Sequence, residues 1–329
     1  MKKVNLLLLI LLLTLTLVTA VGCELEDPAP AGTDATVTTE TAAPETEAET
    51  TLTDLAAADA LNVILGAGKT DEAHADTRWD MDVTVSMGID MGGNQNTTTL
   101  PVKLTVLNDG EQVQMTGSFM GETVDMIYAD GVLYVNFPVM NKKFKCAMTP
   151  EEFAAILSGT ADGALSDAED FSPADIFTSV TSDVVDGDDG ALTVTCKGFH
   201  ADMAAKIAPY LRPLLSSVGF VGGQWGENGY EVDDEKALAQ VLTLLQGISE
   251  DALTVTFTAD ADGVLRAVTM DVTMILDESN ALTTKRTAIN FNGTATVTYG
   301  DQTVIAPADA DRYADAAWED ILKELSPIT

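Results

Sequence analysis

Apolar and polar residues alternate with a period of two along much of this chain, and this pattern predicts β-strands. Residues 81–91 give the clearest case, because every apolar position there falls on one side: Met81, Val83, Val85, Met87, Ile89 and Met91. Polar residues, two of them aspartates, fall on the other side. A strand of this kind is half buried, with one face on a core and the other in solvent.

The same alternation recurs along the rest of the chain and predicts strands at 102–106, 113–119, 122–128, 132–137, 180–198 (a pair), 253–257, 264–276, 289–291 and 297–299. Aspartate-glycine or asparagine-glycine pairs, which favour tight hairpin turns, stand between several of these segments. The predicted turns are at Asp109-Gly110, Asp130-Gly131, Asp262-Gly263 and Asn292-Gly293.

Helical periodicity appears in a smaller set of segments. Residues 55–65 predict an opening helix, and residues 238–245 and 318–325 carry similar apolar stripes. Thr149-Pro150-Glu151-Glu152 is a capping box that starts a helix, and a shorter helix begins at Ser172.

Residues 200–217 also have a helical pattern, in which Pro209 and Pro213 are expected to kink or divide the helix. Half-buried strands joined by short turns, with a few helices, predict an α+β fold. We expect an antiparallel sheet with its helices on one face.

The first residues form an export signal. Lys2 and Lys3 precede an apolar run that is too short for a comfortable membrane span, and this predicts a signal peptide over 1–22. Ala20-Val21-Gly22-Cys23 resembles the lipobox of bacterial lipoproteins, although Ala20 replaces the usual leucine. The resemblance implies that Cys23 is acylated and becomes the mature N-terminus. The protein is then expected on the outer face of a cell membrane, in a bacterium with a single membrane.

Residues 23–53 are predicted to form a disordered stalk. From residue 24 onward this stretch carries eight acidic residues and no lysine or arginine, among threonine, alanine and proline. Such a composition cannot bury enough apolar surface to offset the entropy lost on ordering. Residues 54–329 are then left as one folded α+β domain.

The charge of the chain excludes several classes of partner. The whole sequence has 52 acidic and 17 basic residues, and removal of the signal peptide takes away two lysines. A surface this acidic repels nucleic acid and other polyanions. No cofactor-binding motif is present, and the sequence indicates no particular protein partner.

Cysteines and acidic turns leave two further alternatives. Cys146 and Cys196 either form a disulfide or remain buried free thiols. The aspartates near 183–189 and 260–262 invite a calcium interpretation, but neither group has the spacing of an EF-hand loop. With no nucleophile motif such as GxSxG either, we expect no metal site and no enzyme.

The order of elements resembles that of LolA/LppX-like lipoproteins over roughly residues 55–305. The most similar piece is the hairpin between Leu253 and Arg266, with its Asp260-Ala261-Asp262-Gly263 turn. The resemblance implies a strongly curved sheet, an open half-barrel, with helices packed on its concave face. It also implies a hollow that holds acyl chains or glycolipids.

Methionines and valines on the apolar sides of the predicted strands are the candidate ligand-binding residues. They are Met81, Val83, Val85, Met87, Met115, Met126, Met270, Val272 and Met274. Unbranched, polarisable methionine side chains adapt to apolar ligands of varied shape. In the alternative interpretation these residues fill a solid core, and the protein is a surface structural or protein-interaction module.

One basic cluster interrupts the acidic chain, at Lys142, Lys143 and Lys145. It predicts either a contact with anionic lipid headgroups or an exposed loop before the helix at Thr149.

Overall fold

The computed structural model describes the residues of the predicted folded domain, with gaps. They are 52, 55–67, 76–92, 94–109, 112–119, 122–157, 173–185, 191–217, 223–226, 229–277, 285–300 and 302–325. The predicted signal peptide, Cys23 and nearly all of the predicted stalk lie outside the described residues. Leu52, at the end of that stalk, is buried in the core.

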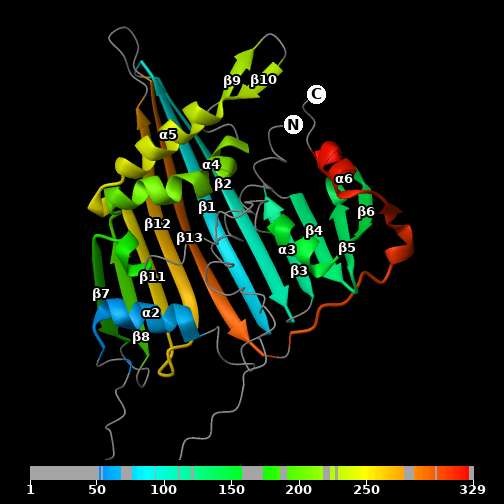
Figure 1. The fold of residues 1–329 in the computed structure, drawn as a ribbon, viewed down its shortest axis with the longest axis horizontal. Coiled ribbons are helices and arrows are strands. Elements are labelled where there is room, and N and C mark those ends of the chain that lie inside the picture. The colour runs from blue at the N-terminus through cyan, green and yellow to red at the C-terminus, as the bar shows by residue number, and fades with distance from the viewer. Residues whose placement is uncertain are drawn as a thin grey trace, which may run out of the picture.

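The centre of the molecule is an open sheet of twelve strands (Figure 1). Its strand order is β14-β6-β5-β4-β3-β2-β1-β13-β12-β11-β8-β7, so the two ends of the sheet do not meet. All neighbours are antiparallel except β14 and β6. With a few helices beside a mostly antiparallel sheet, the fold belongs to the predicted α+β class.

Two meanders of strands extend from the centre of the sheet to its edges. The first consists of β1 (Thr77–Met91), β2 (Asn94–Asn108), β3 (Val113–Phe119), β4 (Glu122–Ala129), β5 (Val132–Phe137) and β6 (Lys142–Ala147). The second consists of β7 (Ser179–Val184), β8 (Leu192–Lys197), β11 (Leu253–Ala259), β12 (Leu265–Asp277) and β13 (Lys285–Tyr299). Pairing of β1 with β13 joins them.

The predicted turn at Asn292-Gly293 is wrong, because β13 runs unbroken through both residues. Gly293 instead lies opposite Val83 of β1, in the middle of the pairing that joins the two meanders. A Cβ atom on Gly293 would lie 2.8 Å from Val83 Cγ2 and 3.0 Å from the Asp82 carbonyl oxygen. The glycine therefore permits a close approach of two backbones.

Strand β2 begins eight residues before its predicted start at 102. Residues 94–99 are polar, and the side chains of 95–99 are exposed. They extend the strand because β1 is fifteen residues long and pairs with β2 along its whole length. A polar segment thus becomes a strand through its backbone partner, which its own sequence does not reveal.

Five α-helices are described: α2 (Ala57–Ala67), α3 (Pro150–Leu157), α4 (Ala204–Ser217), α5 (Asp234–Gln246) and α6 (Trp318–Leu325). In Figure 1, α2, α4 and α5 lie beside the half of the sheet that contains β11 and β12, whereas α3 and α6 lie beside β3 to β6. Contacts place α5 on β12, and α2 on β7, β8, β11 and β12.

The predicted start of α3 is confirmed, whereas the segments after Ser172 and around Pro209 differ from the prediction. The Thr149 N–H donates to Glu152 Oε2 (2.8 Å) and the Glu152 N–H to Thr149 Oγ1 (3.2 Å), which completes the capping box. The helix expected after Ser172 is a single 3-10 turn, Pro173–Ile176. Helix α4 is continuous and is not divided at Pro209 or Pro213. Each proline lacks an N–H group and removes one backbone hydrogen bond, and the remaining hydrogen bonds keep the helix intact.

A short hairpin lies outside the large sheet. Strand β9 (Gly223–Gly226) pairs with β10 (Gly229–Val232) in a separate two-stranded sheet.

After β13, which is a central strand, the chain crosses to the β6 edge of the large sheet. On the way, Val304 N–H donates to Asp109 Oδ2 (3.1 Å) at the β2–β3 turn. Strand β14 (Ala314–Asp315) then pairs with β6, and Ala316 N–H donates to the Lys145 carbonyl oxygen (3.0 Å). The segment leads into α6, so the C-terminal part of the chain covers the β6 edge.

Candidate functional site

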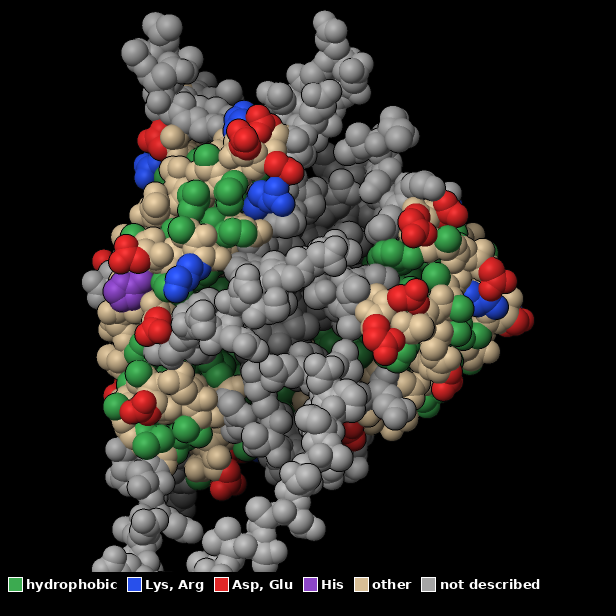
Figure 2. All heavy atoms as spheres, viewed as in Figure 1, with side chains coloured by type: hydrophobic (Ala, Val, Ile, Leu, Met, Phe, Trp, Pro, Cys, Tyr) green, Lys and Arg blue, Asp and Glu red, His purple; other side chains and the backbone are tan. Residues whose placement is uncertain are grey.

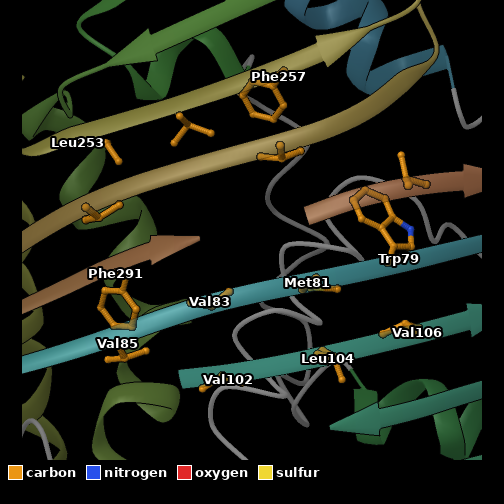
Figure 3. Packing of buried hydrophobic residues seen from close by; sticks show 14 of the residues in the cluster. Trp79, Met81, Val83, Val85, Val102, Leu104, Val106, Leu253, Phe257 and Phe291 are labelled. Atoms are coloured by element: carbon orange, nitrogen blue, oxygen red, sulfur yellow. The ribbon is translucent and has the colours of Figure 1, made fainter. Parts of the chain in front are cut away.

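One face of the large sheet is apolar across most of its strands, and we call it the apolar face. On β1 it is formed by Trp79, Met81, Val83 and Val85, all buried. Figure 3 shows these four side chains along β1, beside Val102, Leu104 and Val106 of β2. The period of two in the sequence produces this face because side chains alternate across a pleated strand.

Strand register carries the apolar face from one meander into the other. Val83 pairs with Val102 on one side and with Gly293 on the other, and Gly293 pairs with Met270 of β12. Met270 pairs in turn with Val255 of β11. Neighbouring strands lie about 4.8 Å apart, so this single row spans about 20 Å across five strands.

All nine predicted ligand-binding residues lie on this face, in two groups. The first occupies β1 and β12, on either side of β13: Met81, Val83, Val85, Met87, Met270, Val272 and Met274. The second is the directly paired Met115 and Met126 on β3 and β4. Strand β2 separates the two groups, and its Val106 pairs with Met115.

Burial divides the nine residues differently. Met115 and Val85 are almost completely enclosed, with 1% and 2% of their surface exposed, and five others are also buried. Met87 and Met270 are half-buried. Most of the apolar face is therefore already covered by the protein itself, and these two methionines are the predicted residues through which solvent reaches it.

Sequence reasoning missed several members of the face. Trp79 precedes the predicted start of β1 by two residues, and its even spacing from Met81 is the signal that would have included it. Phe291 is buried between Val85 and Val272, and its place in the predicted strand at 289–291 is the signal that would have included it. Leu100 continues the row on β2.

Aromatic contacts fix the α3 end of the face. The Tyr128 ring stacks on Phe153 of α3, with centroids 4.3 Å apart, and Tyr128 Oη–H donates to the Met148 carbonyl oxygen (3.3 Å). Burial raises the pKa of Tyr128, and the nearby carboxylates Glu151 and Glu152 raise it further. The phenol is therefore a neutral, satisfied part of the core.

The opposite face of the sheet is polar and paired. Lys103 Nζ lies 2.9 Å from Asp82 Oδ2, Arg78 Nε lies 2.7 Å from Asp80 Oδ2, and Thr105 Oγ1–H donates to Asp80 Oδ1 (2.8 Å). The hydrogen bond from Arg78 is the main cause that holds the pKa of Asp80 below its ordinary value. These ion pairs are exposed to solvent, which is typical of a hydrated sheet surface.

The basic cluster lies on strand β6, so the exposed loop expected there is wrong. Lys143 Nζ is 2.6 Å from Asp309 Oδ2 and 5.1 Å from the centre of the Tyr313 ring. The hydrogen bond with Asp309 raises the pKa of Lys143. Lys145 Nζ lies 3.6 Å from Asp315 Oδ1. Both lysines hold the C-terminal segment to the β6 edge.

No disulfide joins Cys146 and Cys196, and both are free thiols. They lie on β6 and β8, with β5, β4, β3, β2, β1, β13, β12 and β11 between them, so about 40 Å of sheet separates them. A disulfide requires Cα atoms within about 7 Å. Burial raises the pKa of Cys196 to about 12 and also raises that of Cys146.

The Asp260 carboxylate organises a turn. Asp260 Oδ1 accepts hydrogen bonds from the N–H groups of Asp262 (3.1 Å) and Val264 (3.0 Å), and Oδ2 bonds to Arg266. Asp183 is exposed on β7, and the other acidic residues near it lie outside the described part of the chain. Among the described residues, no three histidine, cysteine or acidic side chains converge as metal ligands do.

Acidic side chains are scattered over both flanks of the view in Figure 2, in keeping with the charge of the chain. Within the described segments, no helix has the length and apolar character needed to span a membrane.

Comparison with known proteins gives little guidance. No protein-family model matches the chain, and neither does any curated protein. Among solved structures, the chain is similar to a DUF1329 family protein from Desulfovibrio piger, with 12% sequence identity over 77% of this chain and 94% of that one. The TM-score is 0.17, and at that value the similarity carries no argument about fold or function.

Proposed function

We propose that this protein is an extracytoplasmic lipoprotein that binds the acyl part of a lipid, or another apolar ligand, on the apolar face of its sheet, without catalysis. In this proposal the sheet curves into an open half-barrel and its helices lie on the concave side. The mature chain is anchored by acylated Cys23 to the outer face of the cell membrane, and an acidic stalk separates the domain from that membrane.

The observation that carries the proposal is the continuity of the apolar face across both meanders. Two rows of paired residues carry it to the two ends of the sheet. One runs from Trp79 of β1 through Val106, Met115 and Met126 to Val135 of β5, and the other runs from Val83 of β1 through Gly293, Met270 and Val255 to Cys196 of β8. A core that only had to fill itself needs no particular residue type, whereas six of the chain's twelve methionines have described side chains on this face: Met81, Met87, Met115, Met126, Met270 and Met274. Flexible thioether side chains rearrange around a ligand more readily than branched ones.

Apolar burial supplies the binding free energy in this mechanism. Covering about 300 Å² of acyl chain at about 25 cal/mol per Å² yields roughly 7 kcal/mol. Association entropy and the displacement of covering groups reduce that figure. The half-buried Met87 and Met270 are the points from which a chain would enter the face.

A second candidate function is supported by the burial of the same residues. Val85, Met115 and the other enclosed members of the face are already in contact with protein atoms. On that interpretation the apolar face belongs to a core that the protein's own side chains already fill, and the protein is a surface structural or protein-interaction module. The two candidates differ in whether a ligand copurifies.

Native mass spectrometry of residues 24–329, a form that retains every described residue, tests the binding. We expect the protein to carry acyl lipid after expression in the envelope of a bacterial host. Met270→Gln places a polar group on the apolar face and should lower the bound fraction. Thr269→Gln, one residue away on the exposed face, is the matched control and should leave it unchanged. Bare wild-type protein would favour the second candidate.

Anchoring is tested separately on the full chain. We expect the mature N-terminal peptide to begin at Cys23 and to carry acyl chains, and Cys23→Ala to leave an unacylated precursor. Peptide mass analysis measures both. An unmodified Cys23 within a processed wild-type chain would contradict the anchor and leave the ligand proposal intact.

A further inference from the structure

Trp79 is the one tryptophan on the apolar face, and its polar group has no visible role there. The side chain is 93% buried, with 7% of its surface exposed. Its paired neighbours on this face are Val106 of β2 and Val297 of β13, neither of which accepts a side-chain hydrogen bond. Within the described part of the chain, no group accepts a hydrogen bond from Trp79 Nε1–H.

A buried indole N–H ordinarily has a hydrogen-bond acceptor, because burying the donor without one costs free energy. Tyr128 of the same core follows that rule, because its hydroxyl donates to the Met148 carbonyl oxygen. Trp79 departs from the rule, and Figure 3 places its ring on the same side of β1 as Met81 and Val83. An unpaired donor within a candidate binding face indicates a ligand acceptor.

Several polar side chains lie near the Trp79 end of the apolar face. Tyr299 lies two residue pairs beyond the Trp79–Val297 pair, and therefore on the same side of β13, and burial raises the pKa of its phenol. The Arg266 guanidinium lies 5.4 Å from the centre of the Tyr299 ring and pairs with Asp260 Oδ2. At the other end of the row, Met87 pairs with Ile289, which pairs with Met274.

We propose, building on the ligand binding proposed above, that Trp79 Nε1–H donates to the carbonyl oxygen of a neutral acyl ester or amide, whose hydrocarbon chain runs along β1 towards Met87. Eight residues of strand separate Trp79 from Met87, which is about 27 Å. An acyl chain spans one leaflet of a bilayer core, about 15 Å, so the row is long enough to hold it.

The charge of the site selects a neutral carbonyl over a free fatty acid. Arg266 is a cation at this end of the row, and its guanidinium is hydrogen-bonded to Asp260. A carboxylate on Trp79 would be buried without a countercharge, which is costly. An ester or amide carbonyl accepts the same hydrogen bond with no charge.

Three probes of equal chain length test the proposal on residues 24–329: monopalmitoylglycerol, palmitate and hexadecane. We expect monopalmitoylglycerol to bind most tightly, to shift the indole ¹H–¹⁵N resonance of Trp79 and to slow its exchange with solvent. Hexadecane should bind without slowing that exchange. Trp79→Phe should weaken monopalmitoylglycerol binding about three- to tenfold and leave hexadecane within about twofold, because phenylalanine preserves most of the apolar area.

Trp318→Phe, on α6, is the matched control and should change neither affinity. If Trp79→Phe does not fold, as judged by circular dichroism and thermal melting, the indole resonance of the wild-type protein decides. Binding of monopalmitoylglycerol without any change at the Trp79 indole would overturn the anchor while the proposed function stands. Failure of all three probes to bind the wild-type protein would overturn both.

Discussion

Two dipeptides that end in glycine and look alike in the sequence have different roles in this sheet, one in a turn and the other inside a strand. Asp262-Gly263 and Asn292-Gly293 both stand between apolar alternating segments, and both pairs favour a hairpin turn. The first connects β11 to β12, whereas the second lies in the interior of β13, a strand of fifteen residues. The same dipeptide chemistry therefore serves two different physical needs.

At Asp262-Gly263 the need is conformational. Gly263 has φ of +82°, a region that side chains other than glycine adopt at a cost. Asp260 accepts two backbone hydrogen bonds across the turn, and Gly263 N–H donates to the Asp260 carbonyl oxygen. All of these determinants lie within five consecutive residues.

At Asn292-Gly293 the need is space. Gly293 is not in the left-handed region, and its missing side chain matters because Val83 of β1 lies against it. Val83 is 210 positions earlier in the sequence, so no local pattern around Gly293 can predict the contact between these two residues. A glycine that serves packing cannot be told from one that serves a turn until the strands are paired.

The largest effect is expected for Gly293→Ala, which should lower the free energy of unfolding by about 2–3 kcal/mol. The new Cβ would lie 2.8 Å from Val83 Cγ2 and 3.0 Å from the Asp82 carbonyl oxygen, and the backbone oxygen cannot move aside freely. Urea denaturation measures the change.

Gly88→Ala on β1 is the control for Gly293→Ala. A Cβ there meets nothing closer than Thr97 Oγ1 at 3.7 Å, so the substitution should leave stability unchanged or raise it by up to about 1 kcal/mol. Equal losses at Gly88 and Gly293 would show that the close approach of β1 and β13 is not the cause.

Gly263→Ala should cost about 2 kcal/mol, again measured by urea denaturation. Part of the loss comes from placing alanine at positive φ, and part from contact of its Cβ with Val63 Cγ1 of α2 at 3.3 Å. Gly300 has φ of +85° and nothing within 4 Å of its Cβ position, so Gly300→Ala isolates the first part, about 1 kcal/mol. A larger loss at Gly300 than at Gly263 would refute this division.

Asp260→Ala should lower stability by about 1–1.5 kcal/mol, because two backbone N–H groups of the turn lose their acceptor. Thermal melting of this variant beside Asp262→Ala gives the comparison. Asp262 is exposed at the same turn, and its substitution should change stability by less than about 0.5 kcal/mol. Similar losses in both variants would remove the special role of Asp260.

Asn292→Thr should have the smallest effect, within about 0.5 kcal/mol, because threonine suits an exposed strand position. In contrast, Asp130→Thr, at φ of +54° in the β4–β5 turn, should cost about 1 kcal/mol. Chemical denaturation measures the free energy of unfolding of both variants. A larger loss for Asn292→Thr than for Asp130→Thr would contradict the assignment of Asn292 to a strand and Asp130 to a turn.

Strands β6 and β14, which the sequence failed to predict, were missed for different physical reasons. Strand β6 contains three lysines, and its inward Phe144 and Cys146 form only a short alternation among them. Strand β14 has two residues and exists because the crossing chain arrives beside β6. Strand β6 forms by pairing with the adjacent β5, and β14 forms by pairing with a strand distant in sequence, so the local periodicity of neither strand reveals it.

The candidate site shows the same division. The period of two placed every predicted ligand residue on one face, and that part needed no tertiary information. Which of these residues are enclosed and which, like Met87 and Met270, are half-buried depends on what packs over the sheet. Trp79 joined the site only when its strand was seen to begin before Met81.

By itself the sequence determined the strand faces, the capping box of α3 and the turns at Asp130-Gly131 and Asp262-Gly263, because each depends on residues that are neighbours in the chain. Tertiary structure alone decided the junction of β1 with β13, the coverage of the β6 edge, the separation of the two cysteines and the burial of Trp79, whose indole N–H has no acceptor among the described residues. Those features arise where segments far apart in sequence meet, and their energies depend on contacts that no local pattern encodes.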